Sequence, residues 1–421
     1  MLIMAERSKI IRDPIHGNIK FDGFFIELLD TLEIQRLYNI KQLGFAHLVF
    51  PGAHHTRLEH SFGVYNIAKM LAESLELEES ERDLISCAAL LHDIGHGPFS
   101  HTLESILLEK FGVDHVDVTE KLICGDFNIF DEGERPFIQA SCVHDLLVEH
   151  GLPMKRIVDI IRGKTENKPY LSQMLNSTID ADQLDYLMRD AYYTGVAYGT
   201  IDIDRLLQTV TIFKENLAVQ RKGISAVENI LMARGLMYSS VYFHKTVRIA
   251  ELMLSKAFEL LPDPEPFEFF RMTDLEILSA LTRKGSYQHE IVTRLKYRTL
   301  FKQAFVLSSG DLDKSWCEAL RKLERGEARR EKEHEFESLL HIPKGHVIID
   351  IPAPELERSE PRIHKTDIGV IDNDEVKTLD DYTPIAKAIR SRVAPDWVIM
   401  VVTDEKYRDE VSKKAQKILF D

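Results

Sequence analysis

Apolar residues recur every three or four positions over most of the first 310 residues, and this spacing predicts a succession of amphipathic helices. The segments with this spacing are 24–44, 58–75, 80–93, 102–111, 116–124, 136–148, 154–161 and 223–261, with further helices over 273–307. Pro262 and the two prolines that follow it end the long segment. The pattern predicts a mainly α fold.

Alternating apolar and polar positions predict a few short strands between these helices. Residues 9–22 alternate around a Pro and a Gly, which indicates a hairpin or an extended arm, and residues 209–221 predict a second small hairpin. Near the C-terminus, HVIIDIP, IGVIDN and DWVIMVVTD are β-rich and alternate with the helical runs TPIAKAIRSR and EKYRDEVSKKAQKIL. We therefore expect a small α/β domain at the end of the chain.

Composition and charge exclude several classes of protein. The 53 basic and 68 acidic residues give a formal charge of -15, which argues against a dedicated nucleic-acid surface but not against a small anion in a locally basic pocket. The four cysteines are scattered, as is typical of a reducing cytosol. No stretch approaches the roughly 18 apolar residues of a membrane span, and the N-terminal apolar run is too short for a signal peptide. We expect a cytoplasmic protein without a membrane partner.

The stretch LLHDIGHGPFSH, residues 90–101, carries the densest candidate chemistry. An apolar helix end delivers His92 and Asp93, and a buried imidazole beside a buried carboxylate is costly unless both are paired. A divalent cation would pair with both side chains. An isolated His-Asp dipeptide is more often a hydrogen-bonded pair in a core, so the argument depends on further ligands.

Two further candidate ligands lie on helical segments elsewhere. His60 opens the segment HSFGV, and Asp182 lies in IDADQLDYLMRD. Together with His92 and Asp93 they give two imidazoles and two carboxylates, a set suited to Fe, Mn, Zn, Ni or Co rather than to a closed thiolate site. With four protein ligands, water and substrate can also bind only if the metal takes more than four ligands. This favours a metal with octahedral coordination.

With these ligands, the sequence resembles the HD-domain phosphohydrolases, and among them the deoxynucleoside triphosphate triphosphohydrolases. The motifs that carry the resemblance cover roughly the first 260 residues: KIIRDPIHGNI, LEIQRLYNIKQLG, VFPGAHHTRLEHSFGV, HDIGHGPFSH, IDADQLDYLMRD and YFHK. The resemblance implies that metal-activated water attacks the α-phosphorus of a deoxynucleoside triphosphate. Inorganic triphosphate and a deoxynucleoside would leave, with Mg²⁺ as a further partner of the phosphates.

The resemblance also implies roles for three histidines. His115 matches a histidine that protonates the leaving oxygen; Val116 stands where relatives have an acidic residue, so we expect Asp114 or Asp117 to orient it. His96 and His101 match histidines that contact the α-phosphate. For His101, capping of the helix end is an equally good interpretation.

The substrate contacts implied by the resemblance lie on several segments. Those for the phosphates are Arg57, Arg234, Tyr186 and Gln183, the last in place of a lysine; those for the sugar are Gln42, Leu43, Asp190, Tyr238 and Tyr242. The ring positions Tyr238 and Tyr242 imply that a 2′-hydroxyl is excluded. Without the resemblance, the arginines would be read as surface ion pairs and the tyrosines as core residues.

The regulated branch of this family binds guanine nucleotides at an oligomer interface. Lys9, Asp30, Gln35 and Arg36 match residues of that site, but Tyr38 replaces an arginine there, so the match is only partial. We still expect a homo-oligomer, a dimer or a tetramer. Two other functions stay open: an HD phosphodiesterase or phosphatase for another nucleotide, and a nucleotide-binding regulatory protein with negligible turnover.

The expected organisation has four parts. An N-terminal arm and first helix, 1–48, belong to the catalytic domain; the HD helical bundle spans 49–310; a charged helical connector spans 311–339; and the small α/β domain spans 340–421. The connector is interpreted as a solvated helix because its charges alternate in sign, although its basic residues could contact a substrate or a partner.

Overall fold

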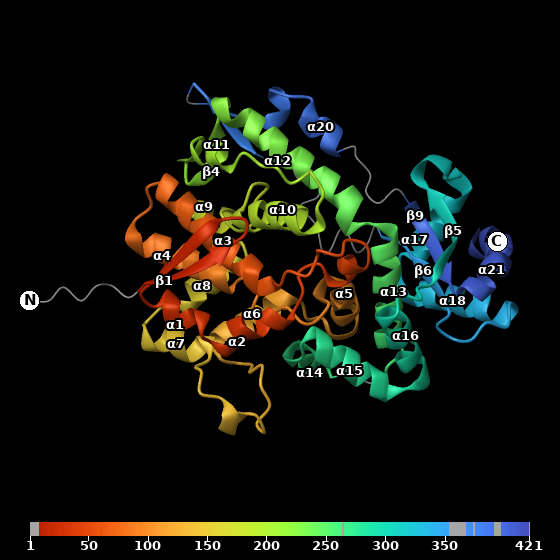
Figure 1. Cartoon of the computed structure of the whole chain (residues 1–421). Coiled ribbons are helices and arrows are strands. Elements are labelled where there is room, and N and C mark those ends of the chain that lie inside the picture. The colour runs from red at the N-terminus through yellow and green to blue at the C-terminus, as the bar shows by residue number, and fades with distance from the viewer. Residues whose placement is uncertain (1–7, 263–264, 353–367, 374, 391–396, 421) are drawn as a thin grey trace, which may run out of the picture.

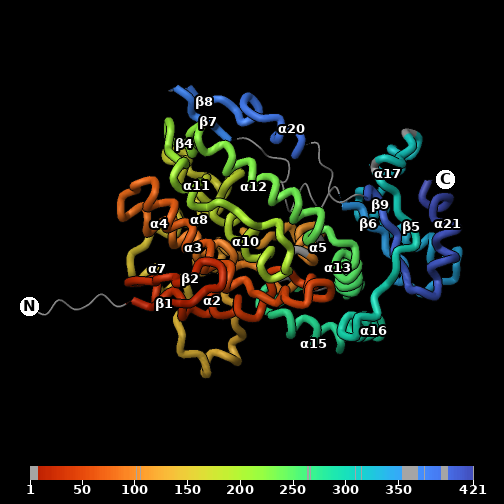
Figure 2. The backbone as a smooth tube through the Cα atoms, turned by 45° about the horizontal axis from the view of Figure 1, so that its top comes forward, coloured from red at the N-terminus to blue at the C-terminus, as the bar shows by residue number. Residues whose placement is uncertain are grey.

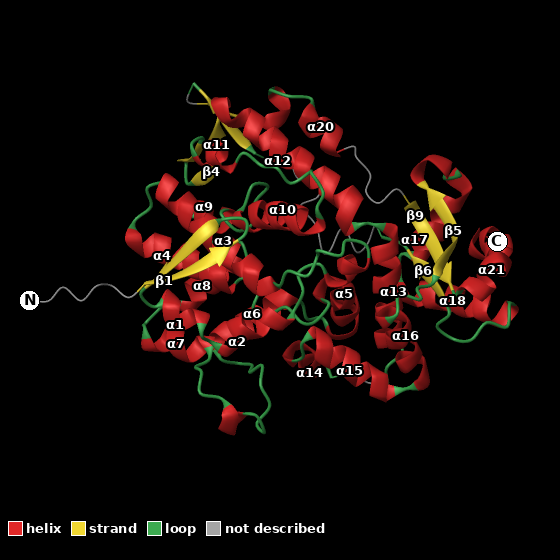
Figure 3. Cartoon of the chain, viewed as in Figure 1, coloured by secondary structure: helices red, strands yellow, loops and turns green. Residues whose placement is uncertain are grey.

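The computed structural model describes residues 8–262, 265–352, 368–373, 375–390 and 397–420. It is mainly α, as predicted, with small sheets at its edges (Figures 1 and 3). Its helices up to residue 207 are α1 (Phe25–Leu29), α2 (Leu32–Arg36), α3 (Arg57–Ser74), α4 (Glu79–Leu91), α5 (Ser100–Phe111), α6 (His115–Cys124), α7 (Val143–Glu149), α8 (Met154–Ile161), α9 (Pro169–Gln173), α10 (Ala181–Thr194) and α11 (Ile203–Leu207). No helix of the described residues is both long enough and apolar enough to cross a lipid bilayer.

Two predicted helices are shorter than the apolar pattern suggested. The segment 24–44 is divided because Thr31 has an extended backbone between α1 and α2, and a 3₁₀ turn, Leu37–Asn39, follows. In the segment 136–148, only a 3₁₀ turn at Arg135–Phe137 and then α7 form. Periodicity does not register such local backbone breaks.

Helices α3, α4 and α10 form the centre of the bundle, and α3 packs on both of the others (Figure 1). Helix α3 begins with a capping box in which Thr56 and Glu59 satisfy each other's backbone N–H groups. Gly63 allows α10 to approach, because a Cβ at this position would lie 1.8 Å from Asp185 Oδ1. The HSFGV motif therefore brings α3 against the helix that carries Asp182.

The predicted long helix 223–261 is wrong as a single element. It consists of α12 (Ile224–Met237), a π-helical turn at Tyr238–Tyr242 and α13 (Lys245–Glu259), and His244 caps the N-terminus of α13. A π turn adds one residue without ending the apolar pattern, so the break is invisible to periodicity. It lies beside the candidate site described below.

The structure contains three small sheets. The two predicted hairpins are confirmed: β1 (Ser8–Asp13) pairs with β2 (Gly17–Asp22), and β3 (Val210–Phe213) pairs with β4 (Asn216–Gln220). The remaining strands are β5 (Lys302–Ser308), β6 (Val347–Asp350), β7 (Gly369–Asp372), β8 (Glu375–Thr378) and β9 (Trp397–Thr403). One sheet has the order β3-β4-β7-β8 and another the order β5-β9-β6.

The strand pairing crosses both boundaries expected between the last three parts. Strand β5 precedes residue 310 and pairs with β9, whereas β7 follows residue 340 and pairs in parallel with β4 of the second hairpin. Figure 2 shows β7, β8 and α20 (Ile385–Arg390) over α12, away from β5, β6 and β9. The strands of the C-terminal part therefore join two different sheets.

The remaining helices are α14 (Pro266–Arg271), α15 (Asp274–Lys284), α16 (Ser286–Lys296), α17 (Cys317–Leu323), α18 (Gly326–Leu339) and α21 (Arg408–Phe420). Of these, α14 and α15 lie below α5, and α17, α18 and α21 lie beside β5, β6 and β9 (Figure 1). Helix α18 buries Phe336 in a second core with β6 and β9, so the charged connector has one apolar face and is not solvated all round.

Candidate metal centre

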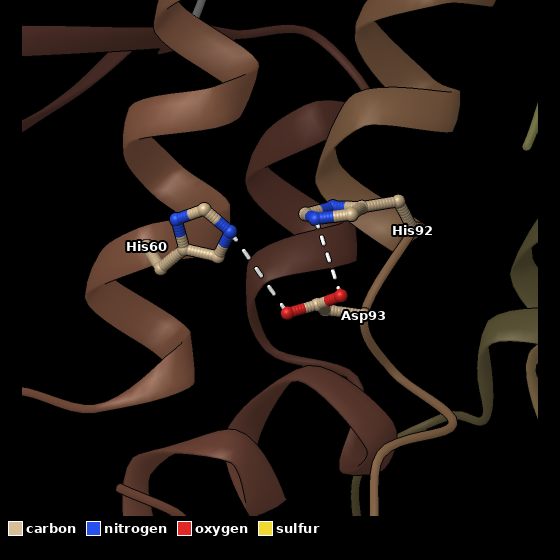
Figure 4. Close-up of side chains that lie close together, drawn as sticks. All are labelled: His60, His92 and Asp93. Carbon is tan, nitrogen blue, oxygen red and sulfur yellow. Dashed lines mark ion pairs between the residues drawn. The ribbon is translucent and has the colours of Figure 1, made fainter. Parts of the chain in front are cut away.

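The predicted ligands converge in the centre of the bundle, carried by three helices. His60 lies in the first turns of α3, His92 caps the C-terminus of α4 with Asp93 directly after it, and Asp182 lies in the first turn of α10. His92 Nε2 is 3.2 Å from Asp93 Oδ1, and His60 Nε2 is 3.9 Å from Asp93 Oδ2 (Figure 4). Asp182 Oδ1 lies 3.1 Å from His60 Nε2 and 3.9 Å from His92 Nε2.

Hydrogen bonds on the far side of each ring orient both imidazoles. His60 Nδ1 donates to Asp185 Oδ2 at 2.8 Å, and His92 Nδ1 donates to the carbonyl of Ala89 at 2.8 Å. In the neutral form of each ring, Nε2 therefore carries the lone pair and faces the carboxylates. This is the arrangement that metal-binding histidines require.

Buried charge around these atoms favours a cation. Burial opposes protonation of His60, yet its hydrogen bonds with Asp182 and Asp185 raise its pKa to about 10. His92 Nε2 is buried and has no hydrogen-bond partner among the described residues. A divalent ion held by His60, His92, Asp93 and Asp182 would satisfy this atom and balance the carboxylates, so the donor set fits the expected metal.

Three side chains behind His60 hold its orienting carboxylate. Asp185 accepts from Arg189 Nε at 2.8 Å and from His16 Nε2 at 2.6 Å, and Arg189 Nη1 reaches Asp13 at 2.8 Å. Arg189 is fully buried, and these carboxylates together raise its pKa against the cost of burial. The strand pair β1-β2 is thereby joined to the metal centre through Asp13 and His16.

His115 lies beside the centre and is oriented by Glu104 of α5, not by either predicted aspartate. The Glu104 carboxylate accepts hydrogen bonds from both the ring and the backbone N–H of His115. Asp114 and Asp117 instead form the capping box of α6. Burial opposes the charged ring, but Glu104 outweighs it and raises the pKa of His115 to about 9.

His96 links His115 to the metal ligands. Its ring stacks on the ring of His115 with 3.8 Å between centroids, and its Nε2 lies 3.2 Å from Asp93 Oδ1. Burial, with Arg57 and His115 nearby, holds the pKa of His96 well below its usual range, so this ring is neutral. The side chain of His101 lies outside the described residues.

The predicted phosphate ligand Arg57 contacts the metal centre directly. Its Nη1 donates to Asp93 Oδ2 at 2.6 Å, and both side chains are buried. With His92 and His96, it holds the pKa of Asp93 well below its usual range despite burial. Asp93 is therefore ionised and ready to bind a cation.

One cavity of about 460 Å³ joins these groups to most of the predicted substrate contacts. Its wall includes Gln42, Leu43, Arg57, His96, His115, Tyr186, Asp190, Tyr238 and Tyr242 with the four candidate ligands. Tyr242 donates to Asp190 Oδ2 at 2.7 Å, and His55 Nε2 lies 2.7 Å from Asp190 Oδ1. Gln183 and Arg234 are both buried and are not among the residues that line this cavity.

The residues that match part of a regulatory site have structural partners. Arg36 is buried and donates to the carbonyls of Ile94 and His96, so it holds the turn after Asp93. Lys9 lies 3.5 Å from Asp30 on the surface, and Gln35 donates to the carbonyl of Leu29. Tyr38 is exposed.

The sequence interpretation missed Glu104 and Asp185 as orienting residues. Asp185 follows Asp182 by three positions, so both carboxylates lie on one face of α10, and this spacing was an available signal. Glu104 lies on α5 and His115 on α6, and no sequence pattern near Glu104 indicates that the two side chains are in contact.

Comparison with known proteins places these observations in a family context. The HD domain model matches residues 57–190, and the model of the HD associated region matches residues 201–420. An uncharacterized protein of Methanocaldococcus jannaschii is 31% identical over 416 residues, which cover 97% of this chain and 82% of that protein. The similarity therefore extends over both the helical bundle and the C-terminal part.

Two relatives have descriptive names. The deoxynucleoside triphosphate triphosphohydrolase SAMHD1 of Homo sapiens is 28% identical over 350 residues, which cover 71% of this chain and 55% of that protein. The crystal structure of a phosphohydrolase from Bacteroides thetaiotaomicron has a TM-score of 0.69 and 25% identity, and the match covers 95% of this chain and 100% of that one. The chain spans about half of the human enzyme.

Proposed function

The chain belongs to the HD domain family of phosphohydrolases, and from this premise we propose that it hydrolyses deoxynucleoside triphosphates to a deoxynucleoside and inorganic triphosphate. The hydrolase class rests on the HD domain and on the phosphohydrolases similar to this chain. The substrate rests on the similarity to a deoxynucleoside triphosphate triphosphohydrolase and on the composition of the cavity.

One observation carries the proposal. The four candidate metal ligands line the same cavity as a buried arginine, two histidines and a group of tyrosines. Its volume of about 460 Å³ falls within the usual range for small-molecule sites, roughly 300–1,000 Å³. A cavity that combines a cation site, an arginine and aromatic rings suits a phosphorylated ligand with a flat base or a sugar.

His60, His92, Asp93 and Asp182 would hold the divalent metal, and a bound metal of this kind lowers the pKa of water and neutralises phosphate charge. Among the protein groups, Arg57 offers guanidinium N–H groups to phosphate oxygens and holds Asp93 in its ionised form. The choice between Fe, Mn, Zn, Ni and Co, and the use of Mg²⁺ on the phosphates, stay predictions.

His115 supplies the proton that the departing deoxynucleoside oxygen needs. Its raised pKa keeps the ring protonated near neutral pH, and Glu104 fixes Nδ1 so that Nε2 is the nitrogen available to donate. The neutral ring of His96 stacks against it and is held in place by Ser100 at Nδ1 and Asp93 at Nε2, so it positions the ring of His115. Both histidines line the cavity.

The sugar contacts follow from the pair formed by Tyr242 and Asp190. Asp190 accepts from Tyr242, which leaves the carboxylate fixed on the cavity wall to accept from a sugar hydroxyl. The rings of Tyr238 and Tyr242 lie 5.0 Å apart and present apolar surface beside it. Such a surface gives no hydrogen bond to a 2′-hydroxyl, which supports a preference for deoxyribose.

The test is turnover of the purified chain on a panel of ribo- and deoxynucleotides with Mn²⁺, Fe²⁺, Co²⁺ or Mg²⁺, together with metal analysis and chromatography of the products. We expect equal amounts of deoxynucleoside and inorganic triphosphate, and no turnover from a His92→Ala variant. Release of a monophosphate or pyrophosphate would favour a phosphodiesterase or phosphatase instead. Nucleotide binding without any product would favour a regulatory protein.

Two expectations about the protein in the cell stay predictions. Oligomerisation as a dimer or tetramer can be measured by sedimentation of the full chain with and without nucleotide. The expected cytoplasmic location can be measured by cell fractionation.

A further inference from the structure

A second cavity, of about 760 Å³, lies between the helical bundle and the outer sheet. Helices α5 and α13 contribute Lys110 and Lys256 to its wall, α18 contributes Arg329 and Arg330, and β6 contributes Asp350. In Figure 1, α13 stands between the bundle and the group formed by α17, α18 and β6. The site lies outside the catalytic cavity and had no role in the mechanism above.

Positive charge is in excess on this wall. Seven Lys and Arg residues line it against six Asp and Glu residues. Arg321, Arg325 and Arg329, on or between α17 and α18, have no carboxylate partner among the described residues. Glu324 and Glu327, both exposed, are the acidic residues that stay unpaired there.

Most of the other charged groups of the wall form ion pairs that join its helices, and Lys110 donates to the carbonyl of Glu259 at 3.1 Å. Arg330 Nη1 lies 3.0 Å from both Glu109 and Glu259, and Lys256 pairs with Glu259 and Glu333. These ion pairs connect α5 and α13 to α18. Arg329 therefore lies on a helix that these pairs hold in place, and α17, which carries Arg321, packs against that helix. A backbone ordered before binding reduces the ordering cost of binding an anion.

Arg248 of α13 separates the second cavity from the catalytic one and lines both. Its Nη2 donates to Asp350 Oδ1 at 2.8 Å, and Asp350 Oδ2 accepts from Trp397 Nε1 at 2.9 Å. A ligand of the second cavity thus lies next to a side chain that also faces the catalytic cavity.

We propose that this second cavity is a binding site for a triphosphate group, held by Arg321, Arg325 and Arg329. The guanidinium fork binds phosphate oxygens in pairs, and three unpaired forks suit an anion with several phosphates better than a single carboxylate. The choice of triphosphate rests on the proposed function, whose substrate and product both carry this group. The source is either a nucleoside triphosphate or free inorganic triphosphate.

The test is isothermal titration of the full chain, with inorganic triphosphate in the Mn²⁺-loaded form and, separately, with dATP in a form that lacks the catalytic metal. The variant is R321Q/R325Q/R329Q, and the matched control is K413Q/K414Q/K417Q on the exposed face of α21, which removes the same charge elsewhere. Catalytic hydrolysis is removed from the dATP titration by H92A in all three backgrounds. Circular dichroism and the melting temperature check that each variant is folded.

We expect the arginine variant to lose one triphosphate site per chain, or to bind it at least tenfold more weakly, while the control matches the wild type. If the arginine variant loses binding of both inorganic triphosphate and dATP, the site recognises the phosphates. If it loses binding of dATP alone, the ligand of the site is a nucleotide. Equal binding in all three proteins overturns the proposal. Because binding is measured directly, this result is independent of whether the chain turns over any nucleotide.

Discussion

Asp185 Oδ2 lies 2.8 Å from His60 Nδ1, so a buried carboxylate fixes the imidazole whose other nitrogen faces the candidate metal. Asp185→Asn removes the charge and keeps the size of the side chain. Because such orienting partners raise the basicity of a metal ligand, we expect a loss of about 10–100-fold in metal affinity. Competition with a chelator measures this loss, with D204N on the exposed surface of α11 as the control.

The same substitution should also lower stability, because Arg189 is fully buried against Asp185 and Asp13. Partial removal of its counter-charge costs free energy of unfolding, which chemical denaturation measures. If D185N and D204N bind metal equally tightly, Asp185 pairs with Arg189 but does not raise the affinity of the site for metal.

His92→Ala should abolish metal binding and turnover while the fold survives. Its Nε2 has no hydrogen-bond partner among the described residues, and Asp93, 3.2 Å from it, keeps its ion pair with Arg57, so loss of the ring leaves no unpaired buried charge. Metal content by mass spectrometry and the far-ultraviolet spectrum test both parts. Equal metal content in variant and wild type would contradict the assignment of His92 as a ligand.

Asp93→Ala removes a metal ligand too, but we expect it to destabilise the fold as well. Arg57, buried and 2.6 Å from Asp93, would lose its carboxylate, and an unpaired buried charge costs on the order of 3–5 kcal/mol. Urea denaturation of the metal-free proteins separates the two effects. A free energy of unfolding equal to that of H92A would show that Arg57 finds another partner.

The convergence of the candidate metal ligands could be predicted because these residues lie on helices with clear apolar periodicity. The bounds of α3 and α4 follow from apolar spacing, and short motifs mark His60, His92 and Asp182 on α3, α4 and α10. The roles of Glu104 and Asp185 in orienting histidines were harder to predict from the sequence, because each role depends on how one helix packs against another.

The C-terminal part was harder to predict for a related reason. The runs that form β7 and β9 are both β-rich, yet β7 pairs with β4, about 150 residues earlier, and β9 pairs with β5. Strand propensity indicates that a segment is extended but not which strand it joins. The π turn at Tyr238–Tyr242 was missed because the apolar pattern continues through it.

Tyr242 should control the choice between deoxyribose and ribose. Tyr242→Ala removes the ring that lines the cavity beside Asp190, and we expect ribonucleotide turnover to rise relative to deoxynucleotide turnover by about tenfold or more. Tyr242→Phe keeps the ring and loses only the hydroxyl bond to Asp190. It should therefore retain the preference for deoxyribose at a lower kcat/KM.

The measurement is the ratio of kcat/KM values for matched ribo- and deoxynucleoside triphosphates. A ratio unchanged in Y242A would assign sugar selection to another wall of the cavity. If Y242F and Y242A change the ratio equally, the hydroxyl rather than the ring is the selective group.

The protonation state of His115 should set the alkaline limit of activity. Glu104 overcomes the effect of burial and raises the pKa of His115 to about 9. A general acid is active only when protonated, so kcat/KM should stay constant through neutral pH and fall as the pH rises through about 9. His115→Ala should lower kcat by about 10²–10⁴-fold, the usual contribution of such a group.

Glu104→Gln provides the sharper test, because it keeps the hydrogen bond to Nδ1 and removes the charge. Burial disfavours the charged imidazolium, and in this variant no carboxylate at position 104 offsets that effect. The pKa of His115 should therefore fall. The alkaline limb of the pH profile should move to lower pH, while metal content stays unchanged because Glu104 is not among the four ligands. The control is E109Q: Glu109 lies five residues further along α5 and pairs with Arg330 instead, so the profile of this variant should match the wild type. A limb at the same pH in E104Q and wild type would mean that a group other than His115 limits the reaction at high pH.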